Sequence, residues 1–165
     1  MKKTLILFVS YFCMIGLWTS CSSSNEYKTS KGGEELNVMH SDCLNTRADD
    51  DEDYIGQQTM VFTKEGSTVY CEWLEFWANC FTFRFIVKPE LNTASDGMDS
   101  LSIFAYGARE EFRLHCQCPY NIYFVVNDVK TDELHVKCDN WVFHFDGVVS
   151  FKEQDRVEIV MEREF

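Results

Sequence analysis

The sequence FRLHCQCPYNIYFVV, residues 112–126, contains the pattern from which the fold can be predicted. Apolar and polar residues alternate along it, which is the two-residue period of a β-strand with one buried face. Cys116 and Cys118 share the apolar face, whereas His115 falls on the opposite one. We interpret residues 119–120, Pro-Tyr, as the break between one inward-facing run and the next.

The same alternation recurs on both sides of this stretch, and Pro89 is expected to end one of the runs. Short strands at short spacing predict an all-β fold, an antiparallel β-sandwich or a barrel-like domain. The alternation argues against a parallel α/β sheet. Trp141, Phe143 and Phe145 are expected to face inward. The expected strands cover residues 59–63, 81–88, 101–105, 112–118, 122–126, 134–138, 141–145 and 157–161.

Residues 69–80, VYCEWLEFWANC, fit helical spacing better than strand alternation. In a regular strand, Glu72 and Glu75 would fall on opposite faces. We therefore predict a short helix near residues 70–78, or an irregular loop. Three aromatic side chains in this segment are candidates for stacking against a sugar or a peptide, although such clusters more often belong to a core: Trp73, Phe76 and Trp77.

The N-terminus is patterned as an export signal, with two lysines before an apolar run at residues 4–18. That run is shorter than the roughly 20 residues of a membrane-spanning helix. Residues 17–21, LWTSC, resemble the lipobox of bacterial lipoproteins, in which the chain is cut before a lipidated cysteine. We predict a signal peptide over residues 1–20 and a palmitate-type anchor on Cys21. The alternative is an ordinary secretory peptide or an uncleaved anchor.

Composition divides the rest of the chain in two. Residues 21–58 are polar and acidic, with few apolar residues, which predicts a flexible tether after the lipidated cysteine. Residues 59–165 are expected to form a single β-domain. Without the signal peptide, 13 basic residues face 27 acidic ones, a net charge of −14. Such a chain is repelled by phosphate backbones, so we expect no nucleic-acid partner.

The chain has 8 cysteines, of which Cys13 lies in the signal peptide and Cys21 in the lipobox. An even number left in an exported chain predicts disulfides, and we expect all of them to be oxidised. Cys116 and Cys118 are two residues apart on a strand, roughly 6.5–7 Å, so each should have a different partner. We expect those partners among Cys43, Cys71 and Cys80, which would link opposite layers. The candidates are Cys43, Cys71, Cys80, Cys116, Cys118 and Cys138.

The sequence predicts neither a metal site nor a cofactor. His115 faces away from Cys116 and Cys118, and the spacing matches neither paired zinc ligands nor a C-x-x-C redox motif. The histidines have no nucleophile at a recognisable motif spacing, and the sequence contains no catalytic signature. We therefore do not expect an enzyme. The alternative is a small envelope enzyme or an enzyme inhibitor that uses an acidic, aromatic surface.

Residues 116–126, CQCPYNIYFVV, fit the pattern C-x-C-x-Y-[DN]-[IL]-x-F-x-[VI]. With the lipobox, this stretch resembles small, uncharacterised, cysteine-rich lipoproteins of anaerobic gut-type Gram-negative bacteria. The resemblance implies a location in the bacterial cell envelope, on the outer membrane and facing the periplasm or the exterior. It implies no activity. We expect a lipid-anchored, disulfide-stabilised protein that acts as a binding or structural module for a protein or glycan ligand.

Overall fold

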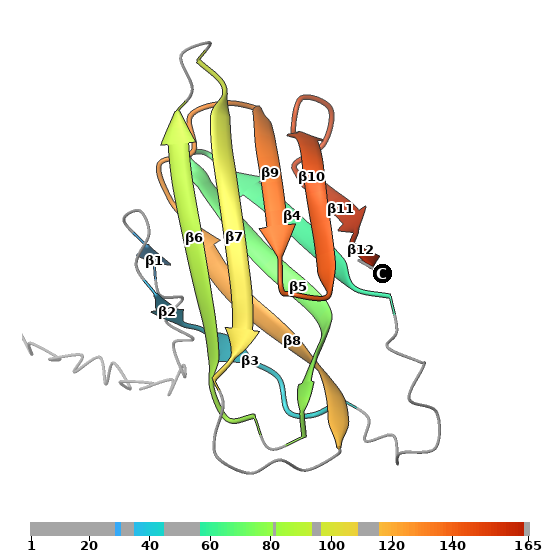
Figure 1. The fold of residues 1–165 in the computed structure, drawn as a ribbon. Coiled ribbons are helices and arrows are strands. Elements are labelled where there is room, and N and C mark those ends of the chain that lie inside the picture. The colour runs from blue at the N-terminus through green and yellow to red at the C-terminus, as the bar shows by residue number, and fades with distance from the viewer. Residues whose placement is uncertain are drawn as a thin grey trace, which may run out of the picture.

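In the computed structural model of the protein, every regular element of the described residues is a β-strand, which confirms the predicted all-β fold. Two sheets pack face to face as a β-sandwich (Figure 1). The signal peptide, Cys21 and residues 112–115 of the strand expected at residues 112–118 lie outside the described part of the chain. The described residues are 29–30, 35–44, 57–80, 82–93, 97–108 and 116–163.

The back sheet of Figure 1 has the strand order β1-β8-β5-β4-β11, and β3 also pairs with β8. The front sheet has the order β12-β10-β9-β7-β6-β2. The back-sheet strands are β1 (Thr29–Ser30), β3 (Met39–His40), β4 (Thr59–Glu65), β5 (Thr68–Asn79), β8 (Gln117–Val126) and β11 (Arg156–Val160). The front-sheet strands are β2 (Leu36–Asn37), β6 (Phe85–Thr93), β7 (Asp99–Gly107), β9 (Glu133–Asp139), β10 (Phe143–Ser150) and β12 (Glu162–Arg163).

Most pairings are antiparallel, as expected, but β7 pairs with β9 in parallel and so does β1 with β8. The chain leaves the front sheet after β7, passes through β8 in the back sheet and returns as β9, so β7 and β9 run the same way. The core lies between the sheets and contains Phe62, Trp73, Phe85 and Phe124, each with no exposed surface. Burial of one such side chain stabilises the fold by about 1.5–3 kcal/mol.

The short helix predicted near residues 70–78 is wrong, because this segment is part of the long strand β5. The register with β8 shifts between Trp73 and Phe76, which is a β-bulge. Glu75 lies in the bulge with a φ of 54°, and its amide donates to the side chain of Asn121 at 3.1 Å. The extra residue brings both Trp73 and Phe76 to the core. These buried residues are therefore three positions apart, as on one face of a helix, although the segment is a strand.

The two prolines do not end strands, in contrast to the prediction. Pro119 lies inside β8, and its carbonyl accepts a hydrogen bond from the Leu44 amide at 3.0 Å. Its ring nitrogen therefore faces the same side as that carbonyl, away from β5, and no bond of the β5 ladder is lost. Pro89 lies inside β6, beyond the short pairing with β2. That side of β6 is an edge, where proline is tolerated.

The expected tether at residues 21–58 needs correction, because residues 35–44 belong to the sandwich. They close one of its edges by crossing from β6 in the front sheet to β8 in the back sheet (Figure 1). Leu36 and Val38 point into the core and are 5% and 7% exposed. The strands are only two residues long, so their apolar content is too sparse to reveal them as periodic.

The opposite edge of the sandwich is closed in the same manner by residues 156–163. β11 pairs with β4 in the back sheet, and β12 pairs with β10 in the front sheet. Met161 lies between these strands, is 3% exposed, and donates its amide to the carbonyl of Gln58 at 2.9 Å. Figure 1 shows this segment on the side of the molecule opposite β2 and β3.

A buried carboxylate holds the β6–β7 end of the front sheet to the loop before β9. Asp99 has no exposed surface and accepts hydrogen bonds from the Thr93 hydroxyl at 2.7 Å and from the amides of Lys130 and Thr131 at 2.5 and 3.1 Å. Burial alone would raise the pKa of Asp99, but these hydrogen bonds outweigh it and the pKa is lowered. The charged form is therefore the one that the fold stabilises.

Candidate functional site

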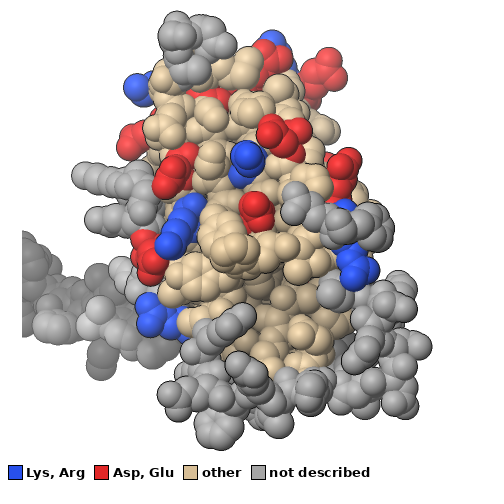
Figure 2. All heavy atoms as spheres, viewed as in Figure 1, with Lys and Arg blue, Asp and Glu red and all other residues tan. Residues whose placement is uncertain are grey.

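Three aromatic side chains form a continuous surface on the outer face of the front sheet, which we call the aromatic surface: Phe104, Tyr106 and Trp141. Phe104 and Tyr106 point outward on β7 because the residues beside them, Ile103 and Ala105, point into the core. The ring centroids of Phe104 and Tyr106 are 5.9 Å apart, and those of Phe104 and Trp141 are 4.9 Å apart. Figure 2 shows this face, where uncharged area lies among scattered basic and acidic side chains.

A buried hydrogen-bond network fixes the β9–β10 loop that carries Trp141. Asn140 is 7% exposed and donates its side-chain amide to Oε1 of Gln58 at 2.8 Å. The same oxygen accepts the indole N–H of Trp73 at 2.8 Å, and the Phe143 amide donates to Oδ1 of Asn140 at 2.8 Å. The loop is therefore anchored in the core.

Trp141 is 75% exposed, the highest value among the large hydrophobic residues of the described chain. Its φ of 76° lies in the left-handed region, which glycine and asparagine occupy far more readily than a bulky residue. Holding such a residue there costs about 1–3 kcal/mol. The amide of Trp141 donates to Asp139 Oδ1 at 2.8 Å, which helps to fix this conformation. The fold thus presents the indole to solvent at an energetic cost.

One end of the aromatic surface carries a polar cluster of Glu35, Lys88 and Tyr106. Lys88 Nζ lies 2.7 Å from Glu35 Oε1 and 5.7 Å from the centroid of the Tyr106 ring. The Tyr106 hydroxyl donates to Glu35 Oε1 at 3.3 Å. The hydrogen bond with Lys88 lowers the pKa of Glu35, and the same bond raises the pKa of Lys88. Both groups therefore stay charged at neutral pH.

Beyond Trp141, basic and acidic side chains also meet in pairs on this face. His135 Nε2 lies 2.9 Å from Asp146 Oδ1, and His144 Nε2 lies 3.7 Å from Glu162 Oε2. Both histidines are partly exposed strand residues. Each of these pairs places an imidazole nitrogen beside a carboxylate, so the face presents hydrogen-bonding groups to solvent.

The aromatic residues predicted as ligand-stacking candidates do not form this surface. Trp73 is fully buried and Phe76 is 3% exposed, so both are core residues. Trp77 pairs with Pro119 on the back sheet and is half-buried. Trp141, in contrast, was expected to face inward with the strand after it, but that strand begins only at Phe143.

Two sequence signals could have identified the aromatic surface. Asp139 and Asn140 are turn-forming residues directly before Trp141, and they favour a loop over a continued strand. Phe104 and Tyr106 occupy alternate positions with inward apolar residues on both sides, where the solvent face of a strand ordinarily carries polar residues. Large aromatic side chains on that face are typical of binding surfaces.

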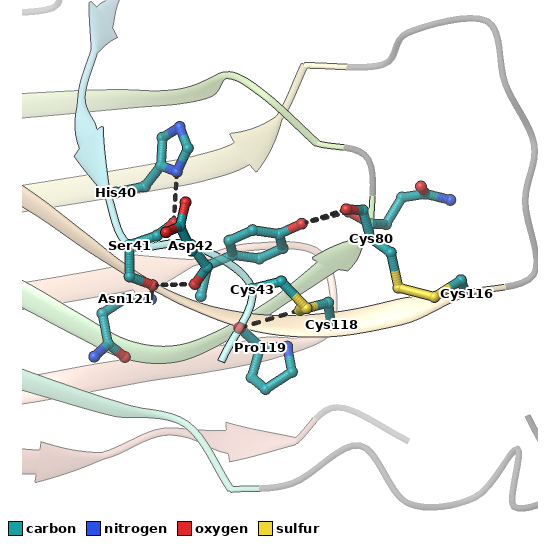
Figure 3. The surroundings of a disulfide bond; sticks show 11 residues. His40, Ser41, Asp42, Cys43, Cys80, Cys116, Cys118, Pro119 and Asn121 are labelled. Atoms are coloured by element: carbon teal, nitrogen blue, oxygen red, sulfur yellow. Dashed lines mark hydrogen bonds between the residues drawn. A yellow bond between two sulfur atoms is a disulfide. The ribbon is translucent and has the colours of Figure 1, made fainter. Parts of the chain in front are cut away.

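The structure joins Cys43 to Cys118 and Cys80 to Cys116, so Cys116 and Cys118 have different partners (Figure 3). The Cα–Cα distances are 5.8 and 5.5 Å. Neither bond links opposite layers as predicted. Both join neighbouring segments of the back sheet, which backbone hydrogen bonds bring together: the Cys80 amide donates to the Cys116 carbonyl at 3.1 Å, and the Leu44 amide donates to the Pro119 carbonyl at 3.0 Å.

Cys71 and Cys138 are free and buried, which contradicts the expectation that all the domain cysteines form disulfides. Cys71 faces the core from β5 and Cys138 faces it from β9. Burial raises the pKa of both thiols, so the reactive thiolate is strongly disfavoured. We interpret them as inert core residues.

The described residues contain no group of three or more His, Cys, Asp or Glu side chains placed to hold a metal ion. No helix long and apolar enough to cross a membrane occurs within the same residues. No protein-family model matches this chain, and no curated protein or solved structure matches it at a significant level.

Proposed function

We propose that the protein is a lipid-anchored, disulfide-stabilised binding module of the bacterial cell envelope that holds its ligand on the aromatic surface. One observation carries the proposal: Trp141 is presented to solvent, 75% exposed, in a conformation that is costly for tryptophan. Tryptophan and tyrosine supply large contact areas at binding sites and dominate their energetics. The function proposed is binding rather than catalysis.

The location rests on the N-terminal sequence and on the disulfides. The apolar run at residues 4–18 and the lipobox ending at Cys21 support export and lipidation of that cysteine. Disulfides such as Cys43–Cys118 persist in oxidising compartments, which include the bacterial envelope. Anchoring by several acyl chains would attach the protein stably to the membrane. Incorporation of radiolabelled palmitate should be lost in Cys21→Ala.

The binding role is tested with Trp141→Gly. The mature protein and this variant are immobilised, and each is exposed to a detergent-solubilised envelope fraction. We expect the wild-type protein to retain a component that the variant does not. Glycine adopts a φ of 76° without steric strain, so the unfolding free energy of the variant should stay within about 1 kcal/mol of the wild-type value. Loss of binding would then not reflect unfolding.

Phe83→Ala is the matched control. Phe83 is another strongly exposed aromatic residue, 67% exposed, and it lies in the segment before β6, outside the aromatic surface. This variant removes a similar apolar area and should retain the component at the wild-type level. Equal retention by the wild-type protein and Trp141→Gly would contradict the proposed function.

A further inference from the structure

We propose that the ligand of the aromatic surface is an uncharged oligosaccharide, an inference that rests on the proposed binding function. The ring planes of Phe104 and Tyr106 are inclined by 41°, whereas those of Phe104 and Trp141 are inclined by 84°. We call the moderately inclined rings of Phe104 and Tyr106 the floor, and the Trp141 indole, which is nearly perpendicular to the Phe104 ring, the wall. A pyranose ring has an apolar face of C–H groups, which such a floor and wall can contact together.

The strand register places a polar side chain on each side of the floor. Phe104 is the Cα partner of Lys88 on β6 and of Asp139 on β9. Adjacent strands are about 4.8 Å apart, so Lys88 and Asp139 lie about 10 Å apart with the Phe104 ring between them. A sugar stacked on Phe104 would direct its edge hydroxyls toward an ammonium group on one side and a carboxylate on the other.

The polar groups around the floor match the chemistry of hydroxyls. Glu35 and Asp139 accept hydrogen bonds, Lys88 donates them, and the Tyr106 hydroxyl does both. A sugar hydroxyl is likewise a donor and an acceptor, so it can join the Glu35–Lys88–Tyr106 cluster without leaving a member of it unpaired. A mostly apolar contact area with a few fixed polar groups is the usual composition of a small-ligand site.

The charges favour an uncharged ligand over an acidic one. Lys88 is already neutralised by Glu35 at 2.7 Å, and the nearest acidic group on the other side, Asp139, is hydrogen-bonded to a backbone amide. The whole chain carries a net charge of −12, which repels anionic polymers. An acidic polysaccharide would therefore meet repulsion and find no unpaired cation in this cluster.

The same ion pairs disfavour a protein partner. A stable protein interface buries about 800 Å² on each side and removes water from its centre. Here Ser100 and Ser102 also point outward from β7, and the Glu35–Lys88 ion pair and the hydrogen-bonded His135–Asp146 pair lie on opposite sides of this strand. Covering these pairs would cost more desolvation free energy than their attraction returns. A narrow saccharide chain leaves them in contact with water.

The test measures binding of the mature protein to immobilised neutral hexasaccharides, namely cellohexaose, maltohexaose, xylohexaose and mannohexaose, with a hexamer of galacturonic acid as the acidic comparison. We expect saturable binding to at least one neutral hexasaccharide. Trp141→Gly should weaken it at least tenfold, and Phe83→Ala should leave it unchanged. Tyr106→Phe, which keeps the ring and removes only the hydroxyl, should weaken it severalfold.

Binding to the acidic hexamer alone, or to none of these saccharides, would overturn the saccharide proposal. Treatment of the envelope fraction distinguishes failure of the saccharide proposal from failure of the proposed binding function. If Trp141-dependent retention survives periodate oxidation of sugars but is lost after proteolysis, the ligand is a protein and the binding function stands. If no retention depends on Trp141 in any arm, the proposed function itself fails.

Discussion

The two edges of the sandwich are closed by segments that perform the same task with different bonds. Residues 35–44 cross from the front sheet to the back sheet at one edge, and residues 156–163 cross from the back sheet to the front sheet at the other. The first segment is fixed covalently through Cys43. The second depends on strand pairing and on the buried side chain of Met161.

Strand length explains the difference. At the first edge, β2 and β3 contribute two residues each, so few ladder hydrogen bonds offset the conformational entropy of ordering the segment. At the second edge, β11 pairs with β4 over five residues, from Arg156 to Val160. A disulfide is therefore most useful where the strands are too short to hold a segment alone.

The largest expected effect on stability is at the edge that the Cys43–Cys118 disulfide fixes. Cys43→Ala with Cys118→Ala removes a bond between residues 75 apart in sequence, and a loop of that length predicts a loss of about 4 kcal/mol in unfolding free energy. Urea denaturation measures this loss. Hydrogen exchange at the amides of Val38 and Leu44 should accelerate, whereas exchange at Met161 should not.

Cys80→Ala with Cys116→Ala is the control for this prediction. It removes a bond between residues 36 apart, so the loss should be smaller, and residues 35–44 should stay protected from exchange. Thiol counting of residues 22–165, unreduced and unfolded, should give two free thiols, from Cys71 and Cys138. Equal exchange in both double variants would show that the Cys43–Cys118 bond does not hold this edge.

A smaller effect is expected at the noncovalent edge from Met161→Ala. This change opens a cavity under the segment between β11 and β12, and it should cost about 2–3 kcal/mol of unfolding free energy. Val160→Ala changes the neighbouring residue, which is 47% exposed, and should cost no more than about 0.5 kcal/mol. Thermal unfolding of the two variants provides the comparison. Similar costs would mean that Met161 does not hold the segment in place.

The smallest expected effect depends on pH, whereas the contribution of the disulfides to the unfolding free energy does not. Asp99→Asn should cost about 2 kcal/mol at pH 7, because a carboxylate that accepts amide and hydroxyl hydrogen bonds loses its charge. The pKa of Asp99 is lowered on folding, so its contribution is present above the unfolded value of about 4 and fades as the pH falls through the folded value. Urea denaturation at successive acidic pH values should show the two proteins converging. A constant difference would contradict the charge assignment.

Alternation of apolar and polar residues was sufficient to predict an all-β fold, because a two-residue period directly reports a buried strand face, but it left a sandwich and a barrel-like domain as alternatives. It failed in β5, where the bulge at Glu75 interrupts the period and imitates a helix. It also failed at residues 35–44, since two-residue strands have no measurable period. The polar, acidic composition was also misleading there, because the segment joins the core through only a few apolar residues such as Leu36 and Val38.

The aromatic surface was missed for a different reason. Trp141 was assigned to a strand that begins only at Phe143, and burial is a nonlocal property that a hydrophobic residue does not report by itself. The sequence likewise did not assign the individual disulfide partners of Cys116 and Cys118, because the pairing depends on which strands become neighbours. The strand order of the sheets is not encoded in any short stretch.

The closed edges have a consequence for molecules held close together on a membrane. An uncovered strand presents a row of unpaired N–H and C=O groups, which invites another copy to add its own strand and start a fibre. The proposed lipid anchor would confine many copies to two dimensions and raise their collision frequency. In this chain most terminal strands are only two residues long, namely β1, β2, β3 and β12, and Pro89 interrupts the part of β6 that β2 leaves uncovered. The terminal segments would thus keep neighbouring copies separate and leave the outer face of the front sheet free.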